Sequence, residues 1–407
     1  MPTSLHIGVG NFFRAHQAWY LHKIGDWDVV GVSLRSPDIR DRLSAQDFRY
    51  HLVIDGTGGR QIERIECLSN ILVAPEDPSA VLKKIRDPQI SLITVTVTEK
   101  GYHLRPDGHL DLDDPTIRDD LHNKLPKSLI GFLAHGLSER DAPITVLSCD
   151  NRTSNGDVLG RAVEAFADRA GLRPPNRQAS FPNSMVDRIT PATDPGLIGE
   201  LEERGVTDAS PVPTEDFSDW VIEHSFQGLQ PDWKSAGVTV VDDVSPFELR
   251  KLRLLNGAHS YLAYAGTLAG HTYVHEAIAD PEMRAGAIGV MTEATQTLPD
   301  AVRSSAPDYA LALIKRFENP GLRHALRQIA MDGSEKVQYR LLDSLAARRD
   351  TPSPFLRAAV EAWINFCISE CQNGRALQDP RAKEIASACA SDAPRVRLAE
   401  LIRYGVK

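Results

Sequence analysis

The pattern of apolar and polar positions along the chain changes near residue 244. Before it, short runs rich in valine, isoleucine and leucine alternate with amphipathic stretches, as in a parallel sheet with crossover helices. The predicted buried strands are residues 5–8, 29–34, 90–98 and 144–149, and the predicted helices are 14–23, 79–85, 128–139 and 158–170. After residue 244 only helical patterns follow, at 246–266, 272–296, 300–317, 321–331, 335–348, 354–373, 379–390 and 393–403. The pattern predicts the α/β class, with one domain at residues 1–244 and a mainly α-helical C-terminal domain at residues 245–407.

Several segments of the first part are less regular. Residues 50–54 and 63–68 predict an exposed pair of strands around a glycine-rich turn at 56–59, and 219–226 and 238–241 predict two more strands. Asn155 and Gly156 are typical of a turn before the helix at 158–170. Residues 181–191 are too irregular to assign.

The segment 245–259 opens the helical part with a recognisable start. Ser245 suits the N-cap, Pro246 suits the first helical position, and Glu248 completes an S-x-x-E capping box. The segment is also placed at the predicted domain junction, and such junctions are favoured places for ligand clefts.

The same segment carries side chains that can handle protons. At roughly 100° per residue, Glu248, His259 and Asn256 fall at about 60°, 80° and 140° from Lys251. Leucines share this arc, and a helix that is apolar on most sides is usually buried. The pattern fits a capped core helix whose lysine reaches the surface, and it fits equally a helix that carries catalytic groups.

A Gly-x-Gly turn follows the first predicted strand. Gly8 and Gly10 allow close approach of the backbone to a pyrophosphate, which the next helix then faces with its N-terminal N–H groups. The third glycine of G-x-G-x-x-G is absent, because Phe13 occupies its position. The turn therefore predicts a Rossmann-type nucleotide-binding domain, with a tight structural turn as the alternative.

Polar residues at the ends of later strands indicate which dinucleotide cofactor could bind. Arg35, after the second strand, could neutralise a 2′-phosphate, whereas Asp38 comes late for the ribose contact that favours NAD and could cap the next helix. The cofactor is therefore predicted as NAD or NADP. Thr98 ends the strand at 90–98 and Glu99 and Lys100 follow it, at an edge where ligands gather, and a charged turn is the alternative.

Composition restricts the partners. The 407 residues carry a net charge of −9 without a basic run, which argues against nucleic acid and anionic membranes. No apolar run approaches the roughly 20 residues of a membrane span, and no signal-peptide pattern precedes the first strand. Five scattered cysteines are typical of reduced thiols in the cytoplasm. His271 and His275 have ligand-like spacing before Glu276, but no further ligand cluster accompanies them, so no metal site is predicted.

Six motifs in chain order resemble the mannitol dehydrogenase family, the polyol-specific long-chain dehydrogenases/reductases. They are G-x-G-x-F-x-R-x-H at residues 8–16, TVTEKGY at 96–102, SCDN at 148–151, FPN with MVDRITP at 181–191, K-x4-N-x2-H at 251–259 and IAMDGS-x-K at 329–336. The resemblance implies a Rossmann-type domain followed by a helical substrate domain, a nicotinamide cofactor and metal-independent chemistry. The implied substrate is a small polyol, its ketose or a sugar acid.

The resemblance also implies roles for single residues. Lys251 would be the general base, Asn256 and Asn151 would hold the alcohol or carbonyl oxygen, His259 would hold a substrate hydroxyl, and Glu248 would be a proton exit. The implied cofactor contacts are Gly8, Gly10, Asn11, Phe12, Arg14, Arg35, Thr98, Glu99 and Lys100. The implied substrate contacts are Asp187, His259, Lys336 and Arg340.

These roles agree with elementary chemistry. A lysine at its reference pKa of about 10.4 is mostly protonated at neutral pH, and burial on a leucine-rich helix lowers the pKa toward the working range. Two amide side chains can stabilise a developing oxyanion. Glu248 acts in the opposite direction, because a nearby carboxylate raises a lysine pKa, so its role stays open between helix cap and proton relay.

One position departs from the pattern. Gln328 stands where relatives that act on mannitol commonly carry an arginine, which favours the subgroup that contains fructuronate reductases. Lys336 and Arg340 could contact a polyol or pair with a sugar-acid carboxylate, and a solvated helix face is the alternative.

Three hypotheses remain after the sequence alone. The first is an NAD(P)-dependent dehydrogenase that interconverts a polyol of the mannitol, arabinitol or altritol type with its ketose. The second is a fructuronate reductase that acts on a keto-sugar acid. The third is a non-catalytic dinucleotide or sugar sensor. The oligomeric state is open between monomer and dimer.

Overall fold

The computed structural model describes residues 1–405, and its internal contacts divide the chain into two compact units. Unit 1 is Met1–Ser245 and unit 2 is Pro246–Lys407. The division falls at the start of helix α9 (Ser245–Arg250), where the sequence pattern changes from mixed to helical.

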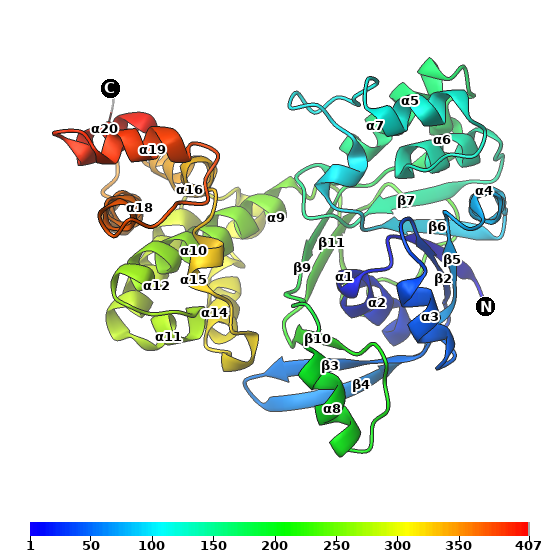
Figure 1. The fold of residues 1–407 in the computed structure, drawn as a ribbon, viewed down its shortest axis with the longest axis horizontal. Helices are drawn as coiled ribbons and strands as arrows, with labels where there is room; N and C mark the ends of the chain where they lie inside the picture. The colour runs from blue at the N-terminus through cyan, green and yellow to red at the C-terminus, as the bar shows by residue number, and fades with distance from the viewer. Residues whose placement is uncertain (406–407) are drawn as a thin grey trace. The chain divides into compact units, whose positions relative to one another are not determined.

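The core of unit 1 is a six-stranded parallel sheet (Figure 1). In chain order its strands are β1 (Thr3–Ile7), β2 (Asp28–Ser33), β5 (Leu68–Val73), β6 (Ile90–Val95), β7 (Ile144–Ser148) and β8 (Ala179–Ser180). They lie in the spatial order β5-β2-β1-β6-β7-β8. Counted along the chain, this is the order 3-2-1-4-5-6 of dinucleotide-binding folds, so the predicted Rossmann-type α/β fold is confirmed.

Both faces of the sheet are buried, which explains its near-continuous apolar strands. Val30 and Val32 of β2 pack into one core cluster, whereas Val29 packs into the other, because successive side chains of a strand point to opposite faces. The helices of unit 1 are α1 (Asn11–Ala15), α2 (Gln17–Ile24), α3 (Asp38–Ser44), α4 (Pro78–Arg86), α5 (Pro115–His122), α6 (Leu129–Ser138), α7 (Asn155–Arg169) and α8 (Pro195–Glu203).

Two three-stranded sheets complete unit 1, with strand orders β10-β3-β4 and β12-β11-β9. Their strands are β3 (Tyr50–Gly56), β4 (Gly59–Ile65), β9 (Ser184–Asp187), β10 (Val212–Glu215), β11 (Asp219–Glu223) and β12 (Thr239–Val241). In the unassigned stretch 181–191, β9 pairs antiparallel with β11.

The predicted strand pair at 50–54 and 63–68 is wrong in two respects. The second strand of the hairpin, β4, ends at Ile65, and Leu68 begins β5 of the main sheet. The first strand, β3, is also largely buried, because β10 pairs with it and α8 packs against Val53, whereas β4 is mostly exposed as predicted. The sequence pattern merged the two strands, since only two residues separate them.

Unit 2 consists of helices and short turns. Its helices are α9, α10 (Gly257–Tyr261), α11 (Val274–Ala279), α12 (Pro281–Thr295), α13 (Asp300–Arg303), α14 (Ala306–Phe317), α15 (Leu326–Ile329), α16 (Gly333–Val337), α17 (Asp343–Ala347), α18 (Pro354–Gln372), α19 (Ala382–Cys389) and α20 (Pro394–Leu401). Three π-helical turns interrupt them, at Lys251–Asn256, Leu262–Gly266 and Gln338–Leu342.

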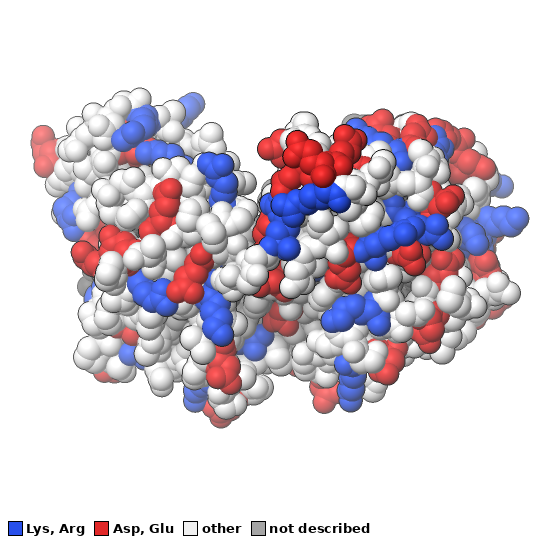
Figure 2. Space-filling model, turned by 90° about the horizontal axis from the view of Figure 1, so that it is seen from below, with Lys and Arg blue, Asp and Glu red and all other residues white. Residues whose placement is uncertain are grey.

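Several predicted helices of this unit are divided in the structure. The segment 272–296 breaks at Asp280, whose carboxylate accepts the N–H groups of Glu282 and Met283 and so caps α12. The segment 321–331 contains only the short α15, after a 3₁₀ turn at Pro320–Leu322. Within residues 1–405, no helix is long and apolar enough to cross a membrane. Acidic and basic side chains are interspersed over the face that Figure 2 shows.

Candidate active site

The Gly-x-Gly turn lies at the carboxyl end of β1, between β2 and β6. Gly8 has a φ of +106°, and a Cβ on it would lie 1.9 Å from the carbonyl oxygen of Thr96, so only glycine fits. The Gly10 N–H donates to the Gly8 carbonyl at 2.8 Å and closes the turn. The first N–H groups of α1 follow directly and have no acceptor within the helix. The predicted Gly-x-Gly turn is therefore present at the end of β1, and its role in phosphate binding stays a prediction.

A buried histidine, which the sequence analysis did not select, holds this turn to β6. The Nδ1 of His6 lies 2.8 Å from the Thr94 hydroxyl, and its Nε2 lies 3.1 Å from the Gly8 carbonyl and 3.0 Å from the Thr96 hydroxyl. Its ring stacks on Phe13 of α1, with centroids 3.5 Å apart. Burial lowers the pKa of His6 to about 3. One neutral imidazole thus joins two strands, the turn and the first helix.

The side chains after the turn are engaged within unit 1. The Asn11 amide donates to the Thr193 hydroxyl at 3.2 Å, and the buried Arg14 donates to the Ser210 carbonyl and to the Asn11 side-chain oxygen. Phe12 stacks on His16. These contacts brace α1, so a cofactor contact of Asn11 or Phe12 would run through the backbone. The cofactor role predicted for Arg14 has no support in its position, and it stays a prediction.

The end of β2 exposes the residues expected at the cofactor ribose. Arg35 is exposed, and Asp38 is the first residue of α3. The Asp38 carboxylate accepts the Ser36 hydroxyl at 3.0 Å. Both side chains lie at the carboxyl edge of the sheet. Their positions are compatible with either NAD or NADP.

Asp150, which is not among the predicted site residues, organises the chain after β6. Its carboxylate accepts the N–H groups of Val97 at 3.0 Å and Thr98 at 3.1 Å, and the Tyr102 hydroxyl at 2.8 Å. Burial raises the pKa of Asp150, and these hydrogen bonds oppose the effect. The carboxylate at the end of β7 thereby fixes the turn at the end of β6.

The predicted cofactor residues of this turn are all exposed. Thr98 has a φ of +68°, and Glu99 and Lys100 lie in a 3₁₀ turn at Glu99–Tyr102. All three lie at the carboxyl edge beside the glycine turn, because β6 neighbours β1.

The chain after β7 differs from the prediction. Asn151 is exposed directly after Asp150. Asn155 is not in a turn but is the first residue of α7, fully buried, and its side chain pairs with Ser184 through both backbone groups, at 2.9 Å each. A Cβ on Gly156 would lie 2.2 Å from the Pro182 carbonyl oxygen, so this glycine serves close packing. Asp187 is buried on β9.

The helix that opens unit 2 carries four predicted catalytic residues on one continuous helical segment. Glu248 lies in α9, Lys251 and Asn256 bound the first π turn, and His259 lies in α10. Lys251 and Asn256 are half-buried, next to the fully buried Leu254. A π turn closes hydrogen bonds between residues five apart, so Lys251 and Asn256 lie closer in direction than the roughly 140° of an α-helix. The segment is therefore both a core helix and a carrier of polar groups.

The start of this helix is held by Asp243, two residues before the predicted cap Ser245. Ser245 is the first helical residue, and its N–H donates to Asp243 at 2.9 Å. The Ser245 hydroxyl also bonds to Asp243, and these two hydrogen bonds lower the pKa of that carboxyl. Asp243 thus caps the helix start. The roles proposed for Glu248 stay predictions.

His259 is buried among cationic and aromatic groups. Its ring centroid lies 4.7 Å from Phe317 and 5.4 Å from His324. Burial, and then the nearby His324, Arg316 and Arg340, hold its pKa well below the ordinary value. His259 is therefore a neutral donor and acceptor at neutral pH, as a hydroxyl-binding group requires.

Lys336 and Arg340 lie close to each other in unit 2. The Lys336 ammonium donates to the Met331 carbonyl at 2.6 Å and lies 3.6 Å from the Asp332 carboxylate. The Arg340 guanidinium donates to the hydroxyl of Ser260, the neighbour of His259, at 3.3 Å. Burial lowers the pKa of both groups, and Arg340 further lowers that of Lys336. The structure thus places Arg340 near both Lys336 and His259.

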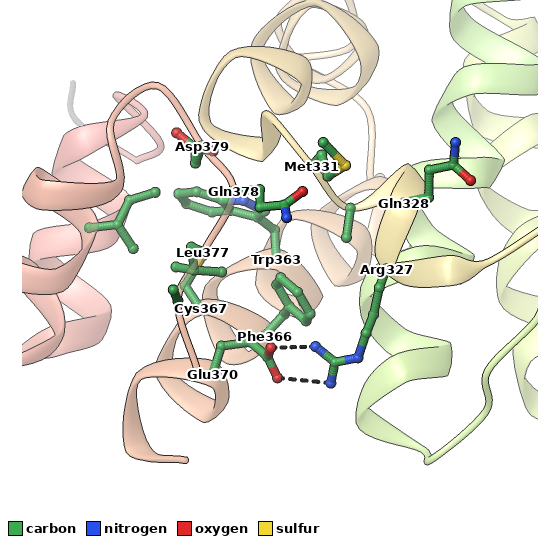
Figure 3. A pocket seen from close by; sticks show the side chains of 13 residues that line it. Arg327, Gln328, Met331, Trp363, Phe366, Cys367, Glu370, Leu377, Gln378 and Asp379 are labelled. Carbon is green, nitrogen blue, oxygen red and sulfur yellow. Dashed lines mark hydrogen bonds and ion pairs between the residues drawn. The ribbon is translucent and has the colours of Figure 1, made fainter. Parts of the chain in front are cut away.

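Gln328 and Glu276, the other two positions that stood out in the sequence, also lie in unit 2. Gln328 is exposed and lines a cavity of about 310 Å³ within unit 2, and the neighbouring Arg327 pairs with Glu370 at 2.5 Å (Figure 3). Glu276 accepts the N–H groups of Thr272 and Tyr273 and so caps α11. Among residues 1–405, no group of three His, Cys, Asp or Glu side chains is placed to hold a metal ion.

Comparisons with known proteins match both units. The family model of the mannitol dehydrogenase Rossmann domain matches residues 2–235, and that of the mannitol dehydrogenase C-terminal domain matches residues 243–403. Mannitol 2-dehydrogenase of Pyrenophora tritici-repentis is 36% identical over 95% of this chain and 73% of its own length. The uncharacterized oxidoreductase YeiQ of Escherichia coli strain K12 is 35% identical over 98% and 86%.

Two solved structures are similar over almost the whole chain. D-sorbitol dehydrogenase in substrate-free form has a TM-score of 0.89 and 30% identity, over 99% of this chain and 91% of its own. Mannitol 2-dehydrogenase of Pseudomonas fluorescens, in a ternary complex with NAD and D-mannitol, has a TM-score of 0.79 and 32% identity, over 99% and 90%. The dinucleotide-fold sheet, the glycine turn, the K-x4-N-x2-H helix and these matches agree, and the chain belongs to the mannitol dehydrogenase family.

Proposed function

We propose that this chain is an NAD(P)-dependent oxidoreductase that interconverts a secondary alcohol of a sugar alcohol with the corresponding ketose. The observation that carries the proposal is the match, at more than 30% identity over nearly the whole chain, to mannitol 2-dehydrogenases, one of them solved with NAD and D-mannitol. The proposed substrates are polyols of the mannitol, arabinitol or altritol type. The non-catalytic sensor is not supported, because the relatives are enzymes that act on CH–OH groups and the Lys251, Asn256 and His259 set is present.

The glycine turn fits a dinucleotide. A Cβ on Gly10 would meet nothing closer than 4.0 Å, so the backbone there is open to a ligand, and the start of α1 supplies N–H groups for phosphate oxygens. The nicotinamide, when bound, accepts the hydride from the alcohol carbon. Gly8, Gly10, Asn11 and Phe12 would hold the pyrophosphate through the backbone. The exposed Arg35 could hold a 2′-phosphate, and Thr98, Glu99 and Lys100 would line the same edge.

Lys251 is the proposed general base, in place of a metal-bound water. Loss of hydride from a secondary alcohol needs a group that takes the hydroxyl proton, and a lysine can do so once its surroundings favour the neutral amine. Half-burial beside Leu254 and Leu255 supports this role. Glu248, one helical turn earlier, would pass the proton on to solvent.

The amides and the histidine would position the substrate. Asn151 and Asn256 would donate to the oxygen that becomes the carbonyl and stabilise its developing negative charge. His259, held neutral, would bind a neighbouring hydroxyl. Asp187, Lys336 and Arg340 would contact hydroxyl groups further along the chain of the substrate.

A second candidate function is the same type of hydride transfer with a keto-sugar acid as the substrate. The pair of cations Lys336 and Arg340 near His259 favours a keto-sugar acid such as fructuronate, whose carboxylate would pair with them. Gln328, in place of the arginine common in mannitol-specific relatives, favours the same alternative.

Turnover with a panel of substrates tests both candidates. Mannitol, arabinitol, altritol and fructuronate are offered with NAD(H) and NADP(H), and the absorbance of the reduced nicotinamide is followed. We expect turnover of at least one polyol. Inactivity with every polyol together with turnover of fructuronate contradicts the first candidate and supports the second.

The proposal extends to the cellular compartment and the binding partners. We propose a reducing compartment, the cytoplasm, because all five cysteines are free thiols. The proposed partners are the small-molecule substrate and the cofactor, with neither nucleic acid nor membrane, and the assembly is a monomer or a dimer.

A further inference from the structure

Three cysteines meet where α18 and α19 pack together in unit 2. The Cys389 thiol, at the last residue of α19, donates to the backbone carbonyl of Cys367 at 3.6 Å. The Cys371 thiol is a further neighbour, and its proximity helps to raise the pKa of Cys389. Cys367 and Cys371 lie one turn apart on α18, so the sulfur of Cys389 rests against that single turn.

The chain between Cys371 and Cys389 supports the segment that carries Lys336. The Gln378 carbonyl accepts the N–H of Asp332 at 2.9 Å. The Asp379 carboxylate accepts the N–H of Ser334 at 2.8 Å and its hydroxyl at 2.5 Å. These bonds fix the start of α16, one turn before Lys336.

The same chain forms one wall of a cavity. Leu377, Gln378 and Asp379 face Trp363 and Phe366 of α18 across the cavity of about 310 Å³ (Figure 3). The wall therefore belongs to the stretch of chain that joins Cys371 on α18 to Cys389 at the end of α19.

We propose that Cys371 and Cys389 form a reversible disulfide on exposure to a peroxide, and that this bond fixes the loop 373–381 and the start of α16. The Cys389 sulfur already lies against the helical turn that ends in Cys371, with the Cys367 carbonyl 3.6 Å away. Both side chains are half-buried, whereas Cys67, Cys149 and Cys367 are fully or almost fully buried.

The steps balance with hydrogen peroxide as the oxidant. The Cys371 sulfur attacks one peroxide oxygen, the S–O bond forms, the O–O bond breaks, and the released hydroxide takes the thiol proton as water. The Cys389 sulfur then attacks the Cys371 sulfur, the S–S bond forms, the S–O bond breaks, and a second water leaves with the Cys389 proton. Two thiols are oxidised by two electrons, and one peroxide is reduced to two waters.

The order of the two sulfurs follows from their surroundings. Burial, and then the neighbouring Cys371, raise the pKa of Cys389 to about 12. Cys389 is therefore a protonated thiol at neutral pH, which leaves the first attack to Cys371, and Cys389 loses its proton to the departing hydroxide in the second step.

Tryptic mapping of the full chain tests the bond. Trypsin separates the two sulfurs, because Arg375, Arg381 and Lys383 lie between them. After hydrogen peroxide treatment and blocking of free thiols, we expect a cross-linked pair of peptides, 358–375 with 384–395, that is lighter by two hydrogens and separates on reduction. Fragmentation assigns the bond to Cys371 or Cys367.

Three variants complete the test. Cys371→Ser and Cys389→Ser should lose the cross-link and keep the activity of the reduced enzyme, and Cys367→Ala should keep the cross-link. Oxidation should also slow amide exchange at 332–334 and 377–379 by about tenfold in the unsubstituted chain and not in Cys389→Ser. A bond to Cys367, or oxidation of Cys371 to sulfinic acid without a cross-link, would overturn the proposal.

Discussion

At the scale of single residues, His6 has one consistent pattern of hydrogen bonds. The Thr96 hydroxyl donates to the Gly8 carbonyl at 2.8 Å, so its oxygen is left to accept from the Nε2–H of His6. The Nδ1 then accepts from the Thr94 hydroxyl. Protonation would put a second N–H at Nδ1 in a fully buried site, which explains the low pKa of this imidazole.

This pattern predicts a loss of stability in acid. The pKa of His6 is about 3 in the folded chain and about 6.5 when unfolded, so between these values the unfolded chain binds more protons. The free energy of unfolding should fall as the pH drops below about 6.5, and His6 should contribute about 1.4 kcal/mol of that fall per pH unit. Urea unfolding of the chain and of His6→Asn between neutral pH and pH ~5 measures the contribution.

The comparison with the variant isolates His6 from other buried histidines, such as His259. His259 also has a lowered pKa and gives a slope of the same sign, and this slope stays in His6→Asn. We expect the variant to be less stable at neutral pH and to depend less on pH. An equal pH slope in both proteins would show that His6 does not carry the effect.

The roles of Asp150, His6 and Asn155 were not predicted from the sequence, and one physical reason explains all three. Asp150 and His6 act through partners that are distant in the chain, at separations of 53 residues to Val97 and 88 to Thr94. Asn155 looked like a local turn signal, but its amide pairs with a strand 29 residues later, and this tertiary contact overrides the local preference. By contrast, Gly8 was predictable, because a tight turn after a strand is a local property.

At the scale of elements, the helix from Ser245 to Gly266 shows which structural features the apolar periodicity of the sequence can predict. Its apolar pattern predicts a buried helix, and Leu254, Ala258 and Leu262 are fully buried. The two π turns were not predictable, because they arise from backbone hydrogen bonds and leave no distinct residue pattern. They change the angle between Lys251 and Asn256, and π turns are frequent at functional sites.

The glycine turn gives a prediction that separates ligand binding from folding. In Gly10→Ala, the added Cβ meets nothing within the protein closer than 4.0 Å, and the φ of −109° suits alanine. We expect an unchanged unfolding temperature and at least a roughly tenfold weaker binding of NAD(P)H, or about 1.4 kcal/mol, because the Cβ would intrude on the pyrophosphate. Fluorescence titration of the reduced cofactor measures the affinity.

Two further glycine variants serve as controls for this turn. Gly58→Ala, in the β3–β4 hairpin with open space around its Cβ, should change neither property. Gly8→Ala should lower the unfolding temperature, because its Cβ would overlap the Thr96 carbonyl. Tight cofactor binding by Gly10→Ala would exclude this turn as the pyrophosphate site.

At the scale of the whole molecule, the class of each part was predictable from its pattern of elements. Strands and helices alternate up to residue 244 and give the six-stranded parallel sheet, and the helical remainder gives unit 2. The sheet order required two strands that the sequence pattern did not resolve. β5 was merged with the hairpin, and β8 has only two residues. Short strands depend on their neighbours for pairing, and a single sequence does not show those neighbours.

The role of Lys251 is the central claim, and Lys251→Ala tests it most directly. Rates of polyol oxidation and dissociation constants for NAD(P)H are measured for the unsubstituted chain, for Lys251→Ala and for Lys315→Ala, an exposed lysine on α14. We predict that Lys251→Ala binds the cofactor normally and loses about 10²–10⁴-fold in kcat, whereas Lys315→Ala keeps both properties. A Lys251→Ala enzyme with normal kcat would contradict the account.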